Sequence, residues 1–222
     1  MSKGIPRDAI AKRAARDLWD GAVVNLGIGL PTMVANHVPD GREIVYHSEN
    51  GVLGVGPTPP KERIDPDLIN ASKTPISLVP GASIFHHTDA FVMIRGGHID
   101  LALLGAMQVS RDGDLANWST GDEKMPPAVG GAMDLAAGAA EVRVLMEHTT
   151  KDGQPKIVEK CVYPLTAPRV VKRIYTNLAV IDVTAAGLVV REIAEGVSFE
   201  ALQGATGAQL ALANDWTKLA VS

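Results

Sequence analysis

The sequence is poor in the residues that mark several large classes of protein. Cys161 is the only cysteine among 222 residues, so no internal disulfide and no zinc-like cysteine cluster can form. Aromatic residues make up 4% of the chain, and Lys and Arg never form a long run. With a net charge of −4, the chain has no basic surface for nucleic acid or an anionic membrane. We expect a cytoplasmic protein in a reducing compartment.

Long hydrophobic runs are also missing. The N-terminal residues lack the apolar core of a secretory signal peptide. The stretch from Gly21 to Pro39 carries no charge, but its Asn, Gly and Pro residues oppose a membrane-spanning helix. Hydrophobic residues at 46% and charged residues at 21% are typical of a globular chain with a sizeable core. No linker or repeat divides the chain, so we expect one domain over residues 1–222.

Hydrophobic patterning predicts alternating helices and strands. Residues 7–19 place Ile10, Ala14 and Leu18 on one face of an amphipathic helix. Alternation of buried runs with helical stretches predicts the α/β class, with an open, mostly parallel sheet, flanking helices and an antiparallel edge. The remaining predicted elements are strands at 22–27, 43–49, 98–105 and 141–148, helices at 31–38 and 130–139, and a hairpin at 176–194.

Glycines after the first predicted strand invite comparison with nucleotide-binding loops. Residues 27–32, GIGLPT, contain Gly-x-Gly, but Thr32 replaces the third glycine of a dinucleotide fingerprint, and no P-loop motif occurs. Gly27 and Gly29 therefore have two interpretations: a tight strand-to-helix turn, or a backbone that approaches a ligand phosphate or oxyanion. The local pattern favours the turn.

One carboxylate in an apolar stretch is the strongest candidate for a catalytic residue. Glu49 ends a predicted strand in HSENGVLGVG, and Asn50-Gly51 lets the chain turn sharply after it. Ligands of open α/β sheets bind beyond the carboxyl ends of the strands. No nearby residue completes a metal site or a carboxylate pair, which favours a base or a covalent nucleophile. A turn-capping or solvated glutamate is the structural alternative.

The six histidines are scattered, and most are expected in loops or in the core. His86 and His87 are the exception, because adjacent imidazoles beside Thr88 and Asp89 could receive a substrate carboxylate.

Several motifs, in a fixed order, resemble one family over roughly residues 7–202: VVNLGIGLPTMVAN, HSENGVLGVGP, DLINA, MIRGGHIDLALLGAMQVS, GDLANW, VGGAMDL and YPLTA. The chain is similar to the B subunit of the two-subunit 3-oxoacid CoA-transferases. From Thr206 onward it carries no motif of that family, and we expect 206–222 to be a variable tail.

The resemblance implies a covalent mechanism and roles for particular residues. Glu49, in Ser-Glu-Asn-Gly, matches the family's nucleophile, which forms a glutamyl-CoA thioester in a ping-pong reaction. Gly131, together with Gly130, would hold the developing oxyanion. No metal and no tightly bound cofactor are implied, and CoA or succinyl-CoA enters as a substrate. The residues expected to contact CoA are Asn50, Gly51, Gly27, Gly29 and Gln108.

The resemblance also implies a partner and an acceptor. The A subunit would supply much of the CoA-binding surface, in a hetero-oligomer with two copies of each chain. Three local features, FHHTDAF, NWSTG and PPAVGGAMDLA, look more like the 3-oxoadipate group, whereas GDEKMPP fits neither group. His86, His87 and Arg95 are then candidates to bind the distal carboxylate of 3-oxoadipate.

Alternative functions remain open at this point. Acetoacetate or acetate could be the acceptor instead of 3-oxoadipate. Water could intercept the thioester, which would make the protein an acyl-CoA hydrolase, or the chain could be a non-catalytic binding subunit, since fold alone does not fix function. A sugar-phosphate isomerase on a related fold is the least favoured.

Overall fold

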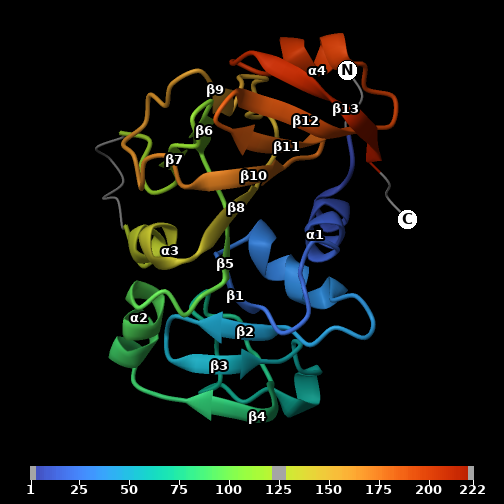
Figure 1. The fold of residues 1–222 in the computed structure, drawn as a ribbon. Coiled ribbons are helices and arrows are strands. Elements are labelled where there is room, and N and C mark those ends of the chain that lie inside the picture. Colours follow the sequence, from blue (N-terminus) through green and yellow to red (C-terminus); the bar gives the residue numbers. More distant parts are fainter. Residues whose placement is uncertain (1–3, 122–128, 220–222) are drawn as a thin grey trace.

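A computed structural model describes residues 4–121 and 129–219. A 10-stranded sheet runs through the molecule in the order β13-β12-β11-β10-β8-β5-β1-β2-β3-β4 (Figure 1). Its strands are β1 Val23–Leu26, β2 Val45–Ser48, β3 Val52–Val55, β4 Leu78–Ile84, β5 Leu101–Leu104, β8 Glu141–Leu145, β10 Val171–Tyr175, β11 Ala179–Thr184, β12 Gly187–Ala194 and β13 Leu210–Leu219.

The centre of the sheet is parallel and its flanks are antiparallel. Strands β10, β8, β5, β1 and β2 all pair in parallel. On one side β2, β3 and β4 pair antiparallel, and on the other β10, β11 and β12 do so before β13 pairs parallel to β12. The predicted α/β class is confirmed, with antiparallel pairing at both flanks instead of one edge.

Helices cover both faces of the sheet. Helix α1 (Arg7–Ala15) lies on one side of the central strands, and α2 (His87–Arg95) and α3 (Ala132–Gly138) lie on the other (Figure 1). The predicted helix at 31–38 is a 3-10 helix, and the helix predicted to reach Trp19 ends at Ala15. The remaining elements are η1 Leu30–His37, η2 Lys61–Arg63 and α4 Phe199–Gly204, and a small sheet of β6 Gln108–Ser110, β7 Leu115–Ala116 and β9 Ile157–Val158.

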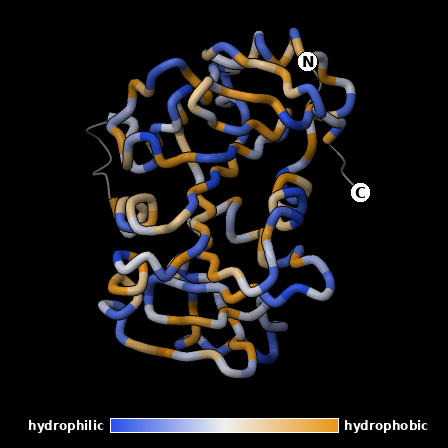
Figure 2. The backbone as a smooth tube through the Cα atoms, in the orientation of Figure 1, coloured by the Kyte–Doolittle hydropathy of each residue, from blue (hydrophilic) through white to orange (hydrophobic). Residues whose placement is uncertain are grey.

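Two hydrophobic cores lie on opposite faces of the sheet, and strand β5 contributes to both. Leu101 and Leu103 belong to the core beneath α1 and η1, whereas Ala102 and Leu104 belong to the core beneath α2 and α3. Successive side chains of a strand point to opposite faces, and a strand buried on both faces is apolar throughout. Strand β5 is accordingly apolar throughout, whereas the other central strands mix hydrophobic and hydrophilic residues (Figure 2).

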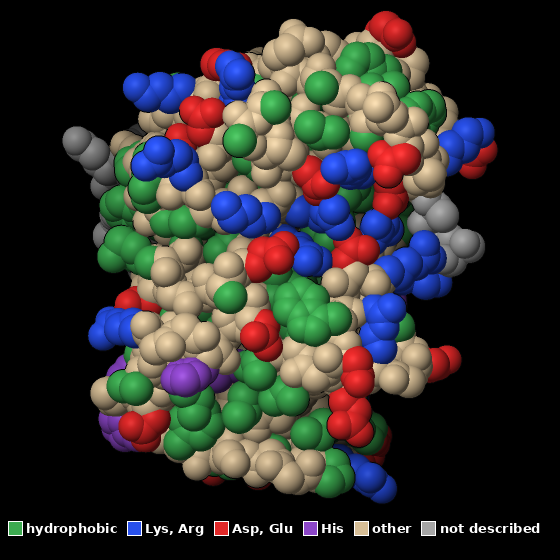
Figure 3. Space-filling view, in the orientation of Figure 1, with side chains coloured by type: hydrophobic (Ala, Val, Ile, Leu, Met, Phe, Trp, Pro, Cys, Tyr) green, Lys and Arg blue, Asp and Glu red, His purple; other side chains and the backbone are tan. Residues whose placement is uncertain are grey.

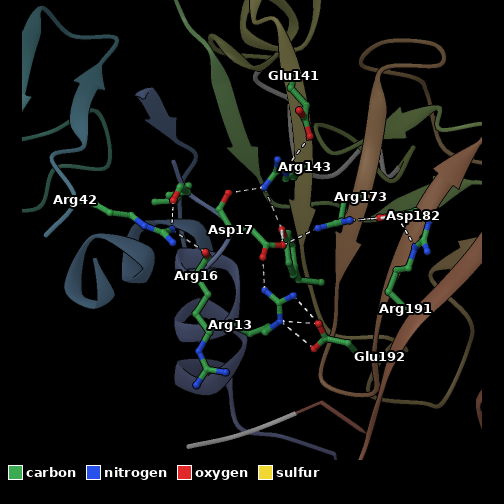
Figure 4. Close-up of polar contacts among 12 residues, drawn as sticks. Arg13, Arg16, Asp17, Arg42, Glu141, Arg143, Arg173, Asp182, Arg191 and Glu192 are labelled. Carbon is green, nitrogen blue, oxygen red and sulfur yellow. Dashed lines mark hydrogen bonds and ion pairs between the residues drawn. The ribbon is translucent and has the colours of Figure 1, made fainter. Parts of the chain in front are cut away.

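Ionic contacts fasten α1 and the turn that follows it to the sheet (Figure 4). The Asp17 carboxylate accepts hydrogen bonds from Arg13 Nη1, Arg173 Nη1 and the Tyr175 hydroxyl, each at 2.7 Å. Arg13 also contacts Glu192 of β12 at 2.5 Å. Charged side chains of both signs form a band across this face at the level of α1 (Figure 3). After Ala15 the chain tightens into a turn in which the Asp17 N–H donates to the Ala14 carbonyl at 3.1 Å, and Asp17 there contacts both Arg13 and Arg173.

The segment expected to be a variable tail is part of the sheet as far as it is described. Residues Leu210–Leu219 form β13, the strand at one edge of the sheet. One sheet runs from this strand to β4, which favours the expected single domain. Within the described ranges, no helix is long and apolar enough to cross a membrane.

Candidate active site

Glu49 lies at the centre of a tight turn between β2 and β3. The Gly51 N–H donates to the Ser48 carbonyl at 3.0 Å, which closes the turn around Glu49 and Asn50. Gly51 has φ +113°, and a Cβ there would overlap the carbonyl oxygen of Phe85. Only glycine fits this position, because side chains rarely adopt such a φ and the neighbouring backbone leaves no space. The turn therefore holds Glu49 at the carboxyl end of β2, next to β1.

The carboxylate of Glu49 rests on the backbone of Gly131, the residue before α3. A Cβ on Gly131 would overlap Oε2 of Glu49, and it would lie 2.7 Å from Cδ and 2.9 Å from Oε1. Glycine is required for this approach, since any side chain would displace the carboxylate. The fold thus brings together two residues that are far apart in the sequence and that were both predicted to take part in chemistry.

The environment of Glu49 disfavours its charged form. The side chain is half-buried, and burial is the main cause that raises its pKa above the usual value for a glutamate. The negative charge of Asp134, in the first turn of α3, raises the pKa further. A carboxylate of raised pKa is a better base and a better nucleophile than an exposed one, as long as it remains ionised.

The other glycines predicted to be functional have identifiable structural roles. The Gly27 N–H donates to Leu103 O at 2.8 Å, and a Cβ on Gly27 would lie 3.1 Å from the same oxygen, so Gly27 allows β1 and β5 to approach. Gly29 has φ +90° and precedes η1, in the predicted turn after β1. Gly130 has φ +57° and is exposed beside Gly131. Ligand binding by these residues stays a prediction.

Two of the residues predicted to contact CoA form hydrogen bonds with backbone groups of this chain. Gln108 is buried, and its Oε1 accepts hydrogen bonds from the Val162 N–H at 2.9 Å and the Tyr163 N–H at 3.4 Å. It thereby anchors the loop after β9. The exposed Asn50 donates through Nδ2 to the Ile69 carbonyl at 2.7 Å. Both residues hold loops in place, and their contact with CoA remains a prediction.

The predicted carboxylate-binding residues lie on α2, whose start packs against the Glu49 turn through Phe85 and Gly51. His86 caps the helix, because its Nδ1 accepts from the Thr88 N–H at 3.2 Å. His87 lies edge-on to the Phe91 ring at 5.6 Å. Histidine side chains gather on this part of the surface (Figure 3). The two imidazoles are thus exposed near the site.

Arg95, at the other end of α2, has a protein partner. Its Nε lies 2.6 Å from Oδ1 of Asp134. The guanidinium is therefore already paired with a carboxylate in this structure. The prediction that it binds a substrate carboxylate loses support, because that role would require it to leave or share Asp134.

Sequence reasoning missed three residues of this site: Asn25, His47 and Asp134. Asn25 Nδ2 lies 3.0 Å from Nδ1 of His47, between the paired strands β1 and β2. His47 is 3% exposed, and burial lowers its pKa to about 4, so its imidazole is neutral at pH 7. A polar residue inside an apolar strand, as Asn25 is in AVVNLG, is a signal that could have been used.

The arrangement can support acid–base or nucleophilic chemistry by one carboxylate against a glycine backbone. Among residues 4–121 and 129–219, no group of three or more His, Cys, Asp or Glu residues is placed to hold a metal ion.

Comparison with known proteins identifies the family. The Coenzyme A transferase family matches residues 7–205. The chain is 54% identical over 210 residues to the B subunit of 3-oxoadipate CoA-transferase from Pseudomonas putida, covering 95% of this chain and 98% of that one. It is 51% identical over 203 residues to the B subunit of succinyl-CoA:3-ketoacid coenzyme A transferase from Helicobacter pylori, covering 91% and 97%.

A solved structure shares the fold. It is an acyl-CoA transferase from Escherichia coli O157:H7, crystallised as a thioester complex with CoA, and it aligns with a TM-score of 0.73 at 17% identity. The alignment covers 100% of this chain and 44% of the E. coli chain, so this chain spans less than half of that protein. The family match and the two close relatives settle the assignment: this chain belongs to the coenzyme A transferase family.

Proposed function

We propose that this chain is the B subunit of an enzyme that transfers CoA from succinyl-CoA to a 3-oxoacid, with 3-oxoadipate as the favoured acceptor. The observation that carries the proposal is the contact of the Glu49 carboxylate with the Gly131 backbone at the carboxyl edge of the parallel strands. The names of the P. putida and H. pylori relatives support the reaction class.

The proposed chemistry divides one exchange into covalent steps. The Glu49 carboxylate attacks the thioester carbonyl of succinyl-CoA, which forms a mixed anhydride and releases CoA thiolate. The thiolate then attacks the glutamyl carbonyl of the anhydride, which forms a glutamyl-CoA thioester and releases succinate. The acceptor carboxylate reverses both steps. Covalent catalysis of this kind replaces one difficult step by easier ones.

Gly131 and Gly130 are proposed to stabilise the tetrahedral intermediates through their backbone. Loss of a single oxyanion donor typically costs about 3–4 kcal/mol of transition-state stabilisation. The close contact of Gly131 with the Glu49 carboxyl group supports this role, because the oxyanion would develop on that group or on the carbonyl it attacks. Asn50, Gly51, Gly27, Gly29 and Gln108 remain proposed CoA contacts.

An A subunit is proposed as the partner, in a hetero-oligomer with two copies of each chain. Both close relatives are named as B subunits, which implies a second chain in those proteins. Large apolar side chains flank the site: Ile28, directly after β1, is 73% exposed, and Met133 in α3 is 51% exposed. Apolar side chains exposed beside a reactive carboxylate suit a surface that another chain covers.

The acceptor is proposed to be 3-oxoadipate because the P. putida relative is named for it and because His86 and His87 are exposed beside the Glu49 turn. Arg95 is the weaker candidate, owing to its ion pair with Asp134. The similar identity to the H. pylori 3-ketoacid transferase keeps acetoacetate as the alternative.

The proposal is tested with this chain co-expressed with its A subunit. Initial rates of 3-oxoacyl-CoA formation from succinyl-CoA are compared for 3-oxoadipate and acetoacetate, with the Glu49→Gln complex as the blank. We expect faster transfer to 3-oxoadipate and no transfer above background in the blank, because an amide is a poor nucleophile. A preference for acetoacetate would overturn the acceptor, and full activity of the Glu49→Gln complex would overturn the mechanism.

A further inference from the structure

An ion pair joins α2 and α3 directly beside the proposed nucleophile. Arg95 Nε and Asp134 Oδ1 are 2.6 Å apart, and the Asp134 side chain is the less exposed of the two. The helices approach closely at this point, since a Cβ on Gly138 would overlap the carbonyl oxygen of Ile94. Arg95, Asp134 and Gly138 line a surface groove of about 260 Å³. The pair therefore occupies a defined place between two packed helices.

The first turn of α3 carries Asp134 close to Glu49. Gly131 contacts the Glu49 carboxylate, and the Leu135 N–H donates to the Gly131 carbonyl at 3.0 Å, which fixes the turn that contains Asp134. The charge of Asp134 acts on Glu49 and, after burial, is the second cause of its raised pKa. Asp134 is thus the carboxylate that the fold places to act on the proposed nucleophile.

Other titratable groups face this region from the packed elements, among the residues the structure describes. His47 on β2 is buried and neutral at pH 7. Helix α2 and its cap contribute His86, His87 and Asp89 besides Arg95. Of the charged groups here, Asp134 is the one whose charge raises the pKa of Glu49.

We propose that Asp134 and Arg95 set the reactivity of Glu49 as a pair of positioning residues with opposite effects. The negative charge of Asp134 destabilises the ionised Glu49 and so favours every neutral form of that side chain, including the glutamyl-CoA thioester. The positive charge of Arg95 offsets part of the charge of Asp134 and limits this effect. The inference rests on the proposed role of Glu49 as the nucleophile.

Protonation of Glu49 and formation of its CoA thioester both remove the negative charge of the side chain. In the overall exchange, the Glu49 carboxylate becomes a neutral thioester and succinate carries a carboxylate charge into solution. Protonation of Glu49 removes the same buried charge. A neighbouring charge that shifts the protonation equilibrium should therefore shift the thioester equilibrium in the same direction, by about tenfold for each unit of pKa.

The first test measures the protonation of Glu49 directly in this chain. The side-chain carboxyl carbon is followed by NMR through a pH titration, with Glu49→Gln to assign the signal. We expect Asp134→Asn to lower the pKa of Glu49 and Arg95→Met to raise it, whereas Arg95→Lys keeps the charge and stays near wild type. Because the charges of Arg95 and Asp134 act on Glu49 in opposite directions, the double variant should give a pKa between those of the two single variants. Shifts of the same sign in both single variants, or no shifts, would overturn the inference.

The second test measures the fraction of glutamyl-CoA thioester in the two-chain complex, by mass spectrometry after equilibration with succinyl-CoA and succinate. We expect less thioester with Asp134→Asn and more with Arg95→Met, by about tenfold for each unit by which the pKa of Glu49 changes in the NMR titration. Arg111→Met breaks the exposed Arg111–Glu159 pair and should change neither quantity. Thioester fractions that do not change in the same direction as the pKa of Glu49 would overturn the inference. Absence of any thioester on Glu49 in wild type would instead overturn the proposed function.

Discussion

At the scale of single residues, the site depends on two glycines, whose lack of a side chain leaves space for neighbouring groups. Gly131 lies so close to the Glu49 carboxylate that a single methyl group would occupy the same space. Gly51 similarly leaves space for the Phe85 carbonyl and adopts a φ that favours glycine. The proposed nucleophile is thus positioned by two glycine contacts, one in its own turn and one before α3.

Substitution of Gly131 tests this geometry. We expect Gly131→Ala to lower kcat/KM for CoA transfer by about 100-fold or more, because displacement of a reacting group by about 1 Å can cost that much. Circular dichroism and thermal unfolding should show that the fold persists.

Gly204→Ala is the matched control, since a Cβ there would meet nothing within 4 Å. It should keep wild-type activity. Equal activity of the two variants would mean that the contact between Gly131 and Glu49 has no part in catalysis.

Turn chemistry made part of the site predictable from the sequence. Asn50-Gly51 after an apolar strand indicated a sharp turn, and the turn does present Glu49 at the end of β2. The pairing of Arg95 with Asp134 was not predictable, because it depends on how α2 and α3 pack across 39 residues of sequence. From its residue type alone, Arg95 was predicted to bind a substrate carboxylate, although in the folded chain it pairs with the carboxylate of Asp134.

At the scale of elements, α1 is held to the sheet by charge as well as by its apolar face. Burial alone would raise the pKa of Asp17, but hydrogen bonds from Tyr175 and Arg13 outweigh burial and hold the pKa below its usual value. The charged form of Asp17 therefore stabilises the fold. This contribution is present above the pKa of Asp17 in the unfolded chain, and it is lost as the pH falls through the lower folded-state pKa.

Replacement of Asp17 measures this contribution at pH 7. We expect Asp17→Asn to lower the free energy of unfolding by about 2–3 kcal/mol, because it leaves Arg13 and Arg173 half-buried without the charge they share. Denaturant unfolding, monitored by circular dichroism, gives the value.

Asp8→Asn, on the same helix, is the control. Asp8 pairs with His37 near the surface, and exposed pairs contribute at most about 1 kcal/mol. If Asp17→Asn lowers the free energy of unfolding no more than Asp8→Asn does, the contacts of Asp17 do not hold α1 in place.

The first helix is shorter than its pattern predicts. Apolar spacing continues to Leu18, which is buried as expected, but the α-helix ends at Ala15. The Asp17 N–H donates to the Ala14 carbonyl and the Leu18 N–H to the Ala15 carbonyl, each at 3.1 Å, so the chain continues in a tighter 3-10-type turn. Periodicity records which residues are buried, and it does not distinguish such a turn from a further turn of α-helix.

At the scale of the whole molecule, the sequence predicted the fold class and some local pairings but not the order of the strands. The hairpin of β11 and β12 follows from two β-rich runs joined by a short turn. The position of β1 between β5 and β2 depends on packing across the whole chain, which no local pattern encodes. That order matters for function, because it places the ends of β1, β2 and β5 side by side around Glu49.

As proposed, the molecule would be one half of an enzyme. The carboxylate of Glu49 lies at the carboxyl ends of the parallel strands, with exposed apolar side chains nearby, including Ile28 and Met133. Water must be kept from a glutamyl-CoA thioester, or the intermediate is hydrolysed. A second chain that covers these side chains would exclude water and complete the site.

The most direct measurement is the capture of the covalent intermediate. The complex with the A subunit is incubated with succinyl-CoA in the absence of an acceptor, quenched in acid, digested with pepsin and analysed by mass spectrometry. We expect that the peptide containing Glu49 gains the mass of one CoA less one water, that 3-oxoadipate removes the modification, and that the Glu49→Gln complex never acquires it. An active complex in which Glu49 stays unmodified, or in which CoA is attached to another residue, would show that Glu49 is not the nucleophile.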